Sequence, residues 1–240
     1  MTDTRRRNNA ILLIVGGLIT LFVVVFLTSP NLSEKLYQAG LNDAESVVLS
    51  LEIGSAELQI QALSEQPAEL MLATIKDFSD AEFEVLGTTQ RQINLRQTAQ
   101  NRTNWMNNQN PEWLIRLNPS VPLTLISRMG AGDTTLDLTP FDLRDVQVDA
   151  GAGDIEVALP SPRTSYTVVW RAGAGENRLR VPEGAALEIQ AFVGAGEVDL
   201  PEDLVNAGGN TWRTPNFDPE QTAIRVQFTG GAGDFELQFD

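Results

Sequence analysis

The sequence of 240 residues contains no cysteine and no histidine. Without cysteine the chain cannot form a disulfide, a thiolate nucleophile, a Cys-ligated zinc site or a lipid-modified cysteine anchor. Without histidine it lacks the general base of Ser-His-Asp and Cys-His hydrolases and a common metal ligand. No Gly-rich phosphate loop is recognisable, because the Gly-rich segments precede strand-like patterns rather than helices. We therefore expect no enzyme, no catalytic residues, no cofactor and no metal site.

Basic residues are also scarce, since 17 Lys and Arg stand against 32 Asp and Glu, giving a formal net charge of −15. Such an acidic surface repels the phosphates of nucleic acids and anionic lipid headgroups. We expect no nucleic-acid partner. Solubility is the simplest role for these acids, and no specific sequence pattern points to a basic peptide as partner.

One apolar run stands near the N-terminus. Ala10 to Leu27 comprises 18 residues without a charge, which as a helix spans about 27 Å, close to the thickness of the bilayer core. Arg5, Arg6 and Arg7 precede it and acidic residues follow, so the positive-inside rule places the N-terminus in the cytoplasm. A cleaved signal peptide is the alternative, but the apolar run is long and no A-x-A cleavage site follows, which favours an uncleaved signal anchor.

These features predict the organisation of the chain at the cell membrane. We expect a cytoplasmic tail over residues 1–9, a single transmembrane helix over 10–27 and a juxtamembrane connector over 28–45. The remaining residues, 46–240, form the predicted extracytoplasmic β-repeat ectodomain.

A four-residue word, Gly-Ala-Gly followed by Asp or Glu, recurs in the second half of the chain. Its copies begin at residues 130, 151, 173, 194 and 231, and a degenerate copy, Gly54-Ser55-Ala56-Glu57, lies upstream. The first three intervals are 21, 22 and 21 residues, and a fixed period of this size is typical of stacked repeats. The predicted structural corner residues are Gly130, Gly132, Asp133, Gly151, Gly153, Asp154, Gly173, Gly175, Glu176, Gly194, Gly196, Glu197, Gly231, Gly233 and Asp234.

Apolar residues alternate with polar ones on both sides of each word, which indicates half-buried strands. Ala150 and Ile155 should both face the core although they are five residues apart, so the backbone must turn between them. Glycine suits such a turn because it reaches positive φ without a Cβ clash. A corner of a stacked coil and a four-residue hairpin loop both satisfy this requirement. The nearly constant spacing favours stacked coils, so we predict an all-β, β-solenoid-like domain of about 21-residue repeats after one transmembrane helix.

The acid that ends each word has two interpretations. A stacked ladder of carboxylates could bind calcium or another divalent ion. However, each repeat supplies one carboxylate, and two of the five are Glu. We favour a solvated acid that caps the corner.

The rest of the chain is less regular. Strand-like patterns around residues 70–75, 83–85 and 93–95 read as divergent repeats without the Gly word. Residues 98–112 are rich in Asn and Gln and read as an exposed loop, in which Trp105 is either a partner contact or folds back on the sheet. The interval from 194 to 231 is 37 residues, which indicates an insertion before the last repeat. We expect that repeat, residues 222–240, to form the exposed final coil, with acids that discourage strand addition.

The runs Gly132–Thr139 (GDTTLDLT) and Gly153–Pro160 (GDIEVALP) resemble the C-terminal β-repeat domain of Lia-type cell-wall-active antibiotic response proteins. That domain belongs to a broader group of toastrack or adhesin-like β-repeat domains, which also accompany phage-shock-type membrane proteins. The resemblance implies a sheet-rich repeat domain tied to the membrane. It also implies a non-enzymatic part in envelope-stress sensing, often beside a two-component histidine kinase. Lia-type proteins carry several membrane helices before this domain, whereas one is predicted here.

Three functions compete at this level. The first is an envelope-facing interaction or stress-sensing module with a protein partner. Its candidate contacts are Trp105, Trp113, Trp170 and Trp212, of which Trp170 is in phase with the core and only Trp105 is expected to be exposed. The second is an adhesin-like protein that self-associates at the cell surface by end-to-end stacking, which a change such as Phe239→Asp would disrupt. The third is a wall hydrolase that uses paired carboxylates such as Asp133 and Asp137 or Glu197 and Asp199. Acids on one side of a strand more often form only a solvated face, so we rank this last.

Overall fold

The computed structural model describes residues 32–64, 68–98 and 110–240, which form nineteen β-strands. These ranges contain no helix that is long and apolar enough to cross a membrane. The predicted tail 1–9 and transmembrane helix 10–27 lie outside the described residues. The all-β prediction is confirmed.

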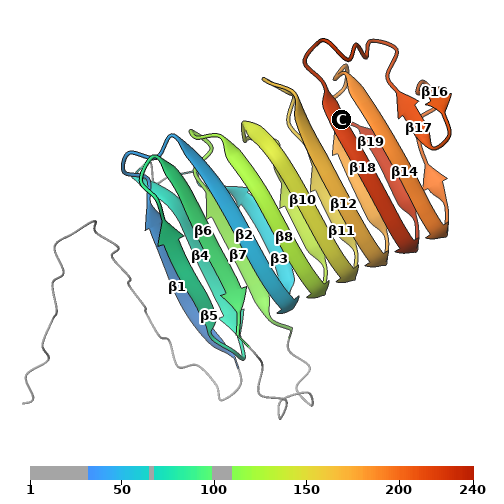
Figure 1. Cartoon of the computed structure of the whole chain (residues 1–240). Helices are drawn as coiled ribbons and strands as arrows, with labels where there is room; N and C mark the ends of the chain where they lie inside the picture. The colour runs from blue at the N-terminus through green and yellow to red at the C-terminus, as the bar shows by residue number, and fades with distance from the viewer. Residues whose placement is uncertain (1–31, 65–67, 99–109) are drawn as a thin grey trace, which may run out of the picture.

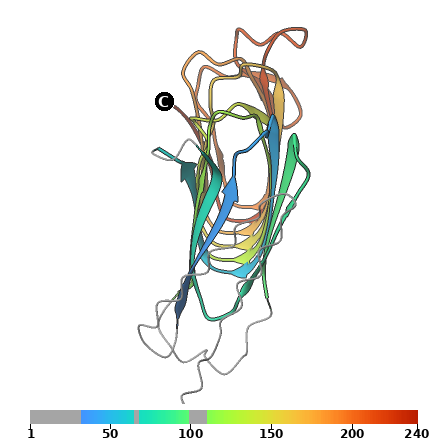
Figure 2. The same ribbon diagram turned by 90° about the vertical axis from the view of Figure 1, so that its left-hand side faces the viewer.

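The strands form two sheets that face each other across the core (Figures 1 and 2). Sheet 1 has the order β1 (Ser33–Gly40), β4 (Glu69–Asp77), β7 (Glu112–Leu117), β3 (Glu57–Ala62), β9 (Thr134–Asp137), β11 (Ile155–Ala158), β13 (Asn177–Val181), β19 (Phe235–Phe239) and β15 (Val198–Asp199). Sheet 2 has the order β5 (Ala81–Leu86), β6 (Gln90–Gln97), β2 (Ser46–Ser55), β8 (Leu123–Ala131), β10 (Leu143–Ala152), β12 (Tyr166–Ala174), β18 (Ile224–Ala232), β14 (Leu187–Ala195), β17 (Thr211–Arg213) and β16 (Val205–Gly208).

Each Gly word carries the chain from sheet 2 to sheet 1. A strand of sheet 2 ends at the corner and a shorter strand of sheet 1 begins after it, as in β10 and β11. Equivalent strands pair in parallel, so that Val146 lies opposite Leu125 on one side and Val168 on the other. Parallel pairing between equivalents is what stacked coils require, whereas the two strands of a hairpin would pair antiparallel with each other.

The coils do not stack in sequence order. The last coil, β18 and β19, lies between the coil of β12 and β13 and the coil of β14 and β15. The prediction of an exposed final coil is therefore wrong, because β19 pairs with β13 on one side and β15 on the other. The long connection after β15 makes this possible by carrying the chain past the fourth coil. Its β16–β17 hairpin extends sheet 2 beyond β14 (Figure 1).

Aromatic side chains fill the place where the last coil inserts. The Trp170 ring lies 5.2 Å from the Phe228 ring and 6.0 Å from the Phe235 ring, both in edge-to-face arrangements. Such pairs stabilise a core by about 0.5–1.5 kcal/mol each beyond their burial. On the other side of Phe228 lies the small Ala191 of β14. Large residues thus meet a small one across the inserted coil.

The domain also begins earlier than the sequence predicts. In place of a connector over 28–45, Ser33–Gly40 form β1, which pairs antiparallel with β4 at the edge of sheet 1. Tyr37 and Ala39 alternate with more exposed neighbours and are buried in the core. The pattern is that of a strand with one buried face, although the Gly word that marks the other coils is absent from it.

Candidate interaction surfaces

The structure brings the predicted corner glycines into one line along the edge of the stack. Gly153 has a φ of 125°, which L side chains rarely adopt. A Cβ at Gly153 would also lie 2.2 Å from the carbonyl oxygen of Gly132 in the preceding coil. The second glycine of each of the other four Gly words also has a positive φ, and a Cβ there would lie 2.0–2.1 Å from a carbonyl oxygen. Glycine at this position thus serves both the turn and the close stacking of coils.

The corner aspartates join neighbouring coils. Asp133 Oδ1 accepts a hydrogen bond of 3.1 Å from the backbone N–H of Asp154, and Asp154 Oδ1 accepts one of 2.9 Å from Glu176 N–H. Asp234 Oδ1 accepts one of 2.9 Å from Glu197 N–H. These oxygens, which a divalent ion would need, are used to bind backbone amides, as short Asp side chains do at turns. Within the described ranges, no group of three acidic residues is arranged to hold a metal ion.

At one end of the stack, side chains close the corner line. Gln97 Oε1 accepts hydrogen bonds from Gly54 N–H at 2.7 Å and Ser55 N–H at 3.0 Å. Gln97 Nε2 donates to Asp77 Oδ2 at 2.6 Å, and the Trp113 indole N–H donates to the same oxygen at 2.9 Å. We call this the closed end. Sequence reasoning missed it because its members come from four separate segments with no common motif.

Across the outer face of sheet 2 runs a row of alternating charges, here called the charged row. It contains one residue from each of six adjacent strands: Glu82, Arg96, Glu52, Arg128, Asp149 and Arg171. Arg96 lies 3.4 Å from Glu52 and 3.9 Å from Glu82, and Arg128 lies 3.7 Å from Glu52. The row appears only when the register of all six strands is known, and for that reason the sequence gives no signal for it.

Asp149 has the shortest ion pair of the row, 2.9 Å from Arg171. Partial burial alone would raise the pKa of the Asp149 carboxyl, but hydrogen bonds from Gln147 and Arg171 and the charges of Arg171 and Arg128 outweigh it. The pKa of Asp149 is therefore lower than its ordinary value. The carboxylate stays ionised at neutral pH and keeps the row alternating in charge.

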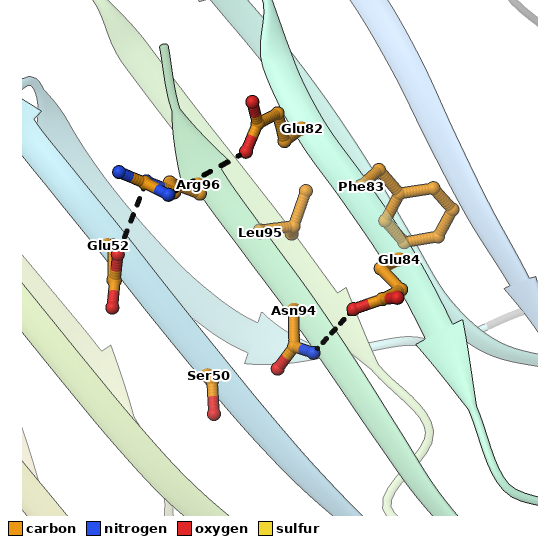
Figure 3. A pocket seen from close by; sticks show the side chains of 8 residues that line it. All are labelled: Ser50, Glu52, Glu82, Phe83, Glu84, Asn94, Leu95 and Arg96. Carbon is orange, nitrogen blue, oxygen red and sulfur yellow. Dashed lines mark hydrogen bonds and ion pairs between the residues drawn. The ribbon is translucent and has the colours of Figure 1, made fainter.

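A shallow hollow lies at the β5 end of the charged row (Figure 3). It measures about 430 Å³ and is lined by Ser50, Glu52, Glu82, Phe83, Glu84, Asn94, Leu95 and Arg96. Figure 3 shows Arg96 between Glu52 and Glu82, while Asn94 donates to Glu84 at 3.1 Å. The hollow is lined by three carboxylates and one guanidinium, so it is acidic and suits a small cationic group. Two of the carboxylates already pair with Arg96, and the third accepts the Asn94 amide.

The remaining predicted site residues are separated. Trp105 lies outside the described residues. Trp113 and Trp170 are buried in the core, and Trp212 is half-buried against it. Of the paired carboxylates, Asp133 binds the next coil, whereas Asp137 Oδ1 accepts hydrogen bonds from the N–H and hydroxyl of Thr139. Asp133 and Asp137 thus accept hydrogen bonds from different partners and do not share one.

Comparisons with known proteins agree with this architecture. Residues 29–180 match the family described as the N-terminal domain of toast_rack. The crystal structure of a "putative cell adhesion protein" from Clostridium sporogenes superposes with a TM-score of 0.80 at 22% identity, over 88% of this chain and all of that chain. A "putative adhesin" from Bacteroides fragilis is 8% identical over 88% of this chain and 98% of its own, but its TM-score of 0.21 is too low to establish a common fold. No curated protein matches the chain.

Proposed function

The chain belongs to the toast_rack N-terminal domain family, and we propose that it is a non-enzymatic protein-interaction module held at the outer face of the cell membrane. The observation that carries this proposal is the charged row. Six charges on six hydrogen-bonded strands are fixed at the strand spacing, which gives a flat and specific electrostatic pattern. Such patterns favour partner selection and orientation more than chemistry. The Clostridium protein, described as a "putative cell adhesion protein", fits the same class.

The predicted membrane anchor determines which end of the stack lies near the membrane. The predicted span ends at Leu27 and β1 begins at Ser33, so a tether between them would consist of five residues, 28–32. Five residues reach at most about 17 Å. The closed end, where Ser33 pairs with Asp77, would then lie near the membrane. The opposite edge of sheet 1, eight strands away at β15, would extend roughly 38 Å further along the stack.

The resemblance to Lia-type proteins supports envelope-stress sensing as the role of this module, with a signalling protein of the membrane as its partner. The test is crosslinking in intact cells, followed by purification of the full-length protein and mass spectrometry. We expect a membrane signalling protein as the dominant partner, and we expect Arg128→Glu to weaken its capture. Arg163→Glu is the matched control, because Arg163 is exposed and forms no ion pair with any described residue. Capture of no envelope protein would contradict the proposal.

Membrane placement has its own test. The protein should remain with the membrane after alkaline carbonate extraction, and protease added outside spheroplasts should degrade the β domain. Release by carbonate would contradict the anchor, and protection from protease would contradict the orientation.

The alternative is an adhesin-like protein that self-associates end to end. The test that the sequence suggests, Phe239→Asp, does not suit the observed fold, because Phe239 lies in β19 inside the stack. Phe239→Asp would therefore disturb the fold rather than an interface. Phe192→Asp, at an exposed position, is the suitable variant, and only self-crosslinks in the cell experiment would favour this alternative.

A further inference from the structure

The end of the stack opposite the closed end is only partly covered by the described residues. The hairpin strand β17 pairs with Glu188–Gln190 of β14, and two further backbone bonds join Ala191 N–H to Asn210 O and Thr214 N–H to Leu187 O, each at 3.0 Å. From Phe192 to Asp199 no described strand pairs with the outer edge of this coil. We call this segment the open end. Sheet edges of this kind present free backbone groups that can pair with an added strand.

The corner within the open end keeps an unused donor. In the other Gly words, the N–H of the second glycine donates to an alanine carbonyl of the following coil, as from Gly153 to Ala174 at 3.0 Å and from Gly233 to Ala195 at 2.9 Å. Gly196 is the equivalent residue of the fourth coil, and its N–H has no partner among the described residues. The open end is therefore a coil that has no next neighbour among the described residues.

Apolar core side chains are also left partly uncovered there. Val198 is half-buried, whereas Ile155 and Phe235 at the equivalent position are fully buried. Val193 is half-buried beside it, and Phe192, which points outward, is 52% exposed. Covering such surface stabilises a complex by about 25 cal/mol for each Å² removed from water.

The negative charge around the open end favours a basic segment as the added strand. Between Ala191 and Trp212 the chain has four acids, Glu197, Asp199, Glu202 and Asp203, and no Lys or Arg. None of the four forms an ion pair with a described residue, and the nearby Arg213 is bound to Glu188 at 2.6 Å. An incoming chain with Lys or Arg would neutralise these carboxylates.

The same charges disfavour a second copy as the occupant. The closed end carries Glu82 and Glu84 on its edge strand β5, and its corner amides already bind Gln97. Head-to-tail stacking would therefore find no free corner amide at the closed end, and two open ends would face each other with the same four carboxylates. Like charges across an interface oppose association.

We propose that the open end binds an extended segment of a partner protein by strand addition, and that this segment alternates apolar with basic residues. In a strand, successive side chains point to opposite faces. Beside β15, its apolar residues would cover Val198 while its Lys or Arg residues meet Glu197 and Asp199 on the other face. Main-chain hydrogen bonds to the edge give affinity in this mode, and side-chain contacts give specificity. This inference rests on the proposed interaction function and names the surface and the chemistry of the partner.

The test uses the full-length protein in detergent and a fluorescein-labelled octapeptide of alternating valine and lysine. We expect saturable binding in fluorescence anisotropy that weakens with added salt. Hydrogen exchange should show new protection only in residues 192–200. The double variant Glu197→Gln, Asp199→Asn should bind roughly tenfold more weakly, because the basic side chains lose their counter-charges.

The control variant is Asp43→Asn, Glu45→Gln, which makes the same charge change in the exposed loop between β1 and β2 and should leave the affinity unchanged. An equal loss in both double variants would overturn the proposal, since it would mean attraction to net charge alone. Concentration-dependent dimers that strengthen in Glu197→Gln, Asp199→Asn would identify a second copy as the occupant and also overturn it. If the cellular partner is captured equally by this variant, the docking edge is wrong while the interaction function stands.

Discussion

The indole N–H of Trp113 donates a hydrogen bond of 2.9 Å to the carboxylate of Asp77, and both residues are about 1% exposed. The same carboxylate receives the amide of Gln97, which holds the first corner. Strands β4, β6 and β7 thus meet at one buried oxygen. A buried acceptor with several donors stabilises a fold chiefly because losing it leaves every donor without a partner.

We therefore expect Asp77→Ala to lower the free energy of unfolding by about 3 kcal/mol, with a smaller loss in Asp77→Asn, which keeps one acceptor oxygen. Denaturant unfolding of the full-length protein in detergent, followed by circular dichroism, measures both. Asp145→Asn is the control, because Asp145 is exposed and makes no side-chain hydrogen bond with the described residues. Equal stability of Asp77→Ala and the control would show that the closed end does not depend on this carboxylate.

Gly153→Ala should destabilise the stack by more than about 3 kcal/mol, because backbone strain at positive φ is added to a clash with the preceding coil. Gly184→Ala is a matched comparison, since Gly184 has a φ of 77° but a Cβ there would meet no atom within 4 Å. It should lose only about 1–2 kcal/mol, the cost of the left-handed conformation. Similar melting temperatures for the two variants would refute the close stacking of corners.

Variants of the corner acids can show whether these side chains cap backbone amides or bind a divalent ion. Asp154→Ala removes the acceptor for Glu176 N–H and should cost about 1 kcal/mol, as other lost backbone caps do. Glu176→Ala should change little, because the Glu176 carboxylate accepts no hydrogen bond from the described residues. Thermal unfolding with and without calcium checks both expectations. A rise in melting temperature with calcium that Asp154→Asn abolishes would instead support the divalent-ion ladder.

The charged row predicts a pH dependence. Because the pKa of Asp149 is lowered in the folded protein, its ion pair contributes stability above the unfolded Asp value of about 3.9. That contribution is lost as the pH falls through the lowered pKa. Arg171→Gln should therefore be less stable than Arg163→Gln at neutral pH, by less than about 1 kcal/mol for so exposed a pair. The difference should shrink in urea titrations at successively lower pH, and a pH-independent difference would assign the loss to packing.

Because the last coil lies between two earlier coils, we expect it to restore a truncated chain when it is added as a separate peptide. A chain that ends at residue 221 lacks Phe228 and Phe235, so the fourth coil has nothing to stack on beside Trp170. We expect amides of residues 187–199 to exchange rapidly in this variant and to regain protection when a peptide of residues 222–240 is added. Full protection without the peptide would mean that the fourth coil stacks directly on the third.

How much of this could be read from the sequence depends on how local each feature is. The turn at each Gly word follows from the phase of Ala150 and Ile155, which are separated by only five positions, and the sequence was sufficient there. The order of the coils could not be read from the sequence, because the words at Gly173, Gly194 and Gly231 present nearly the same backbone groups to a neighbour. What selects the order is the fit of Trp170, Phe228 and Ala191 across three strands, and side-chain volumes in contact cannot be read along a chain.

The interaction surfaces lay beyond sequence reasoning for the same reason. Arg96 and Glu52 are 44 positions apart, and nothing but the register of β2 with β6 brings them together. The acids near Glu197 are visible in the sequence, but their meaning changes with the fold. Sequence order places them beside an interior coil, whereas the insertion of β18 and β19 puts them at an end of the stack.

That insertion also means that the fold is complete only after β18 and β19 have been synthesised. The fourth corner leaves the ribosome 37 residues before the last corner, an interval of roughly 2–7 seconds at about 5–20 residues per second. During that time the fourth coil exists without the neighbour it will have in the finished molecule. A chain released before β18 and β19 are made lacks the coil that lies between the third and fourth coils. The native stack is therefore reached only by molecules whose synthesis has passed β18 and β19.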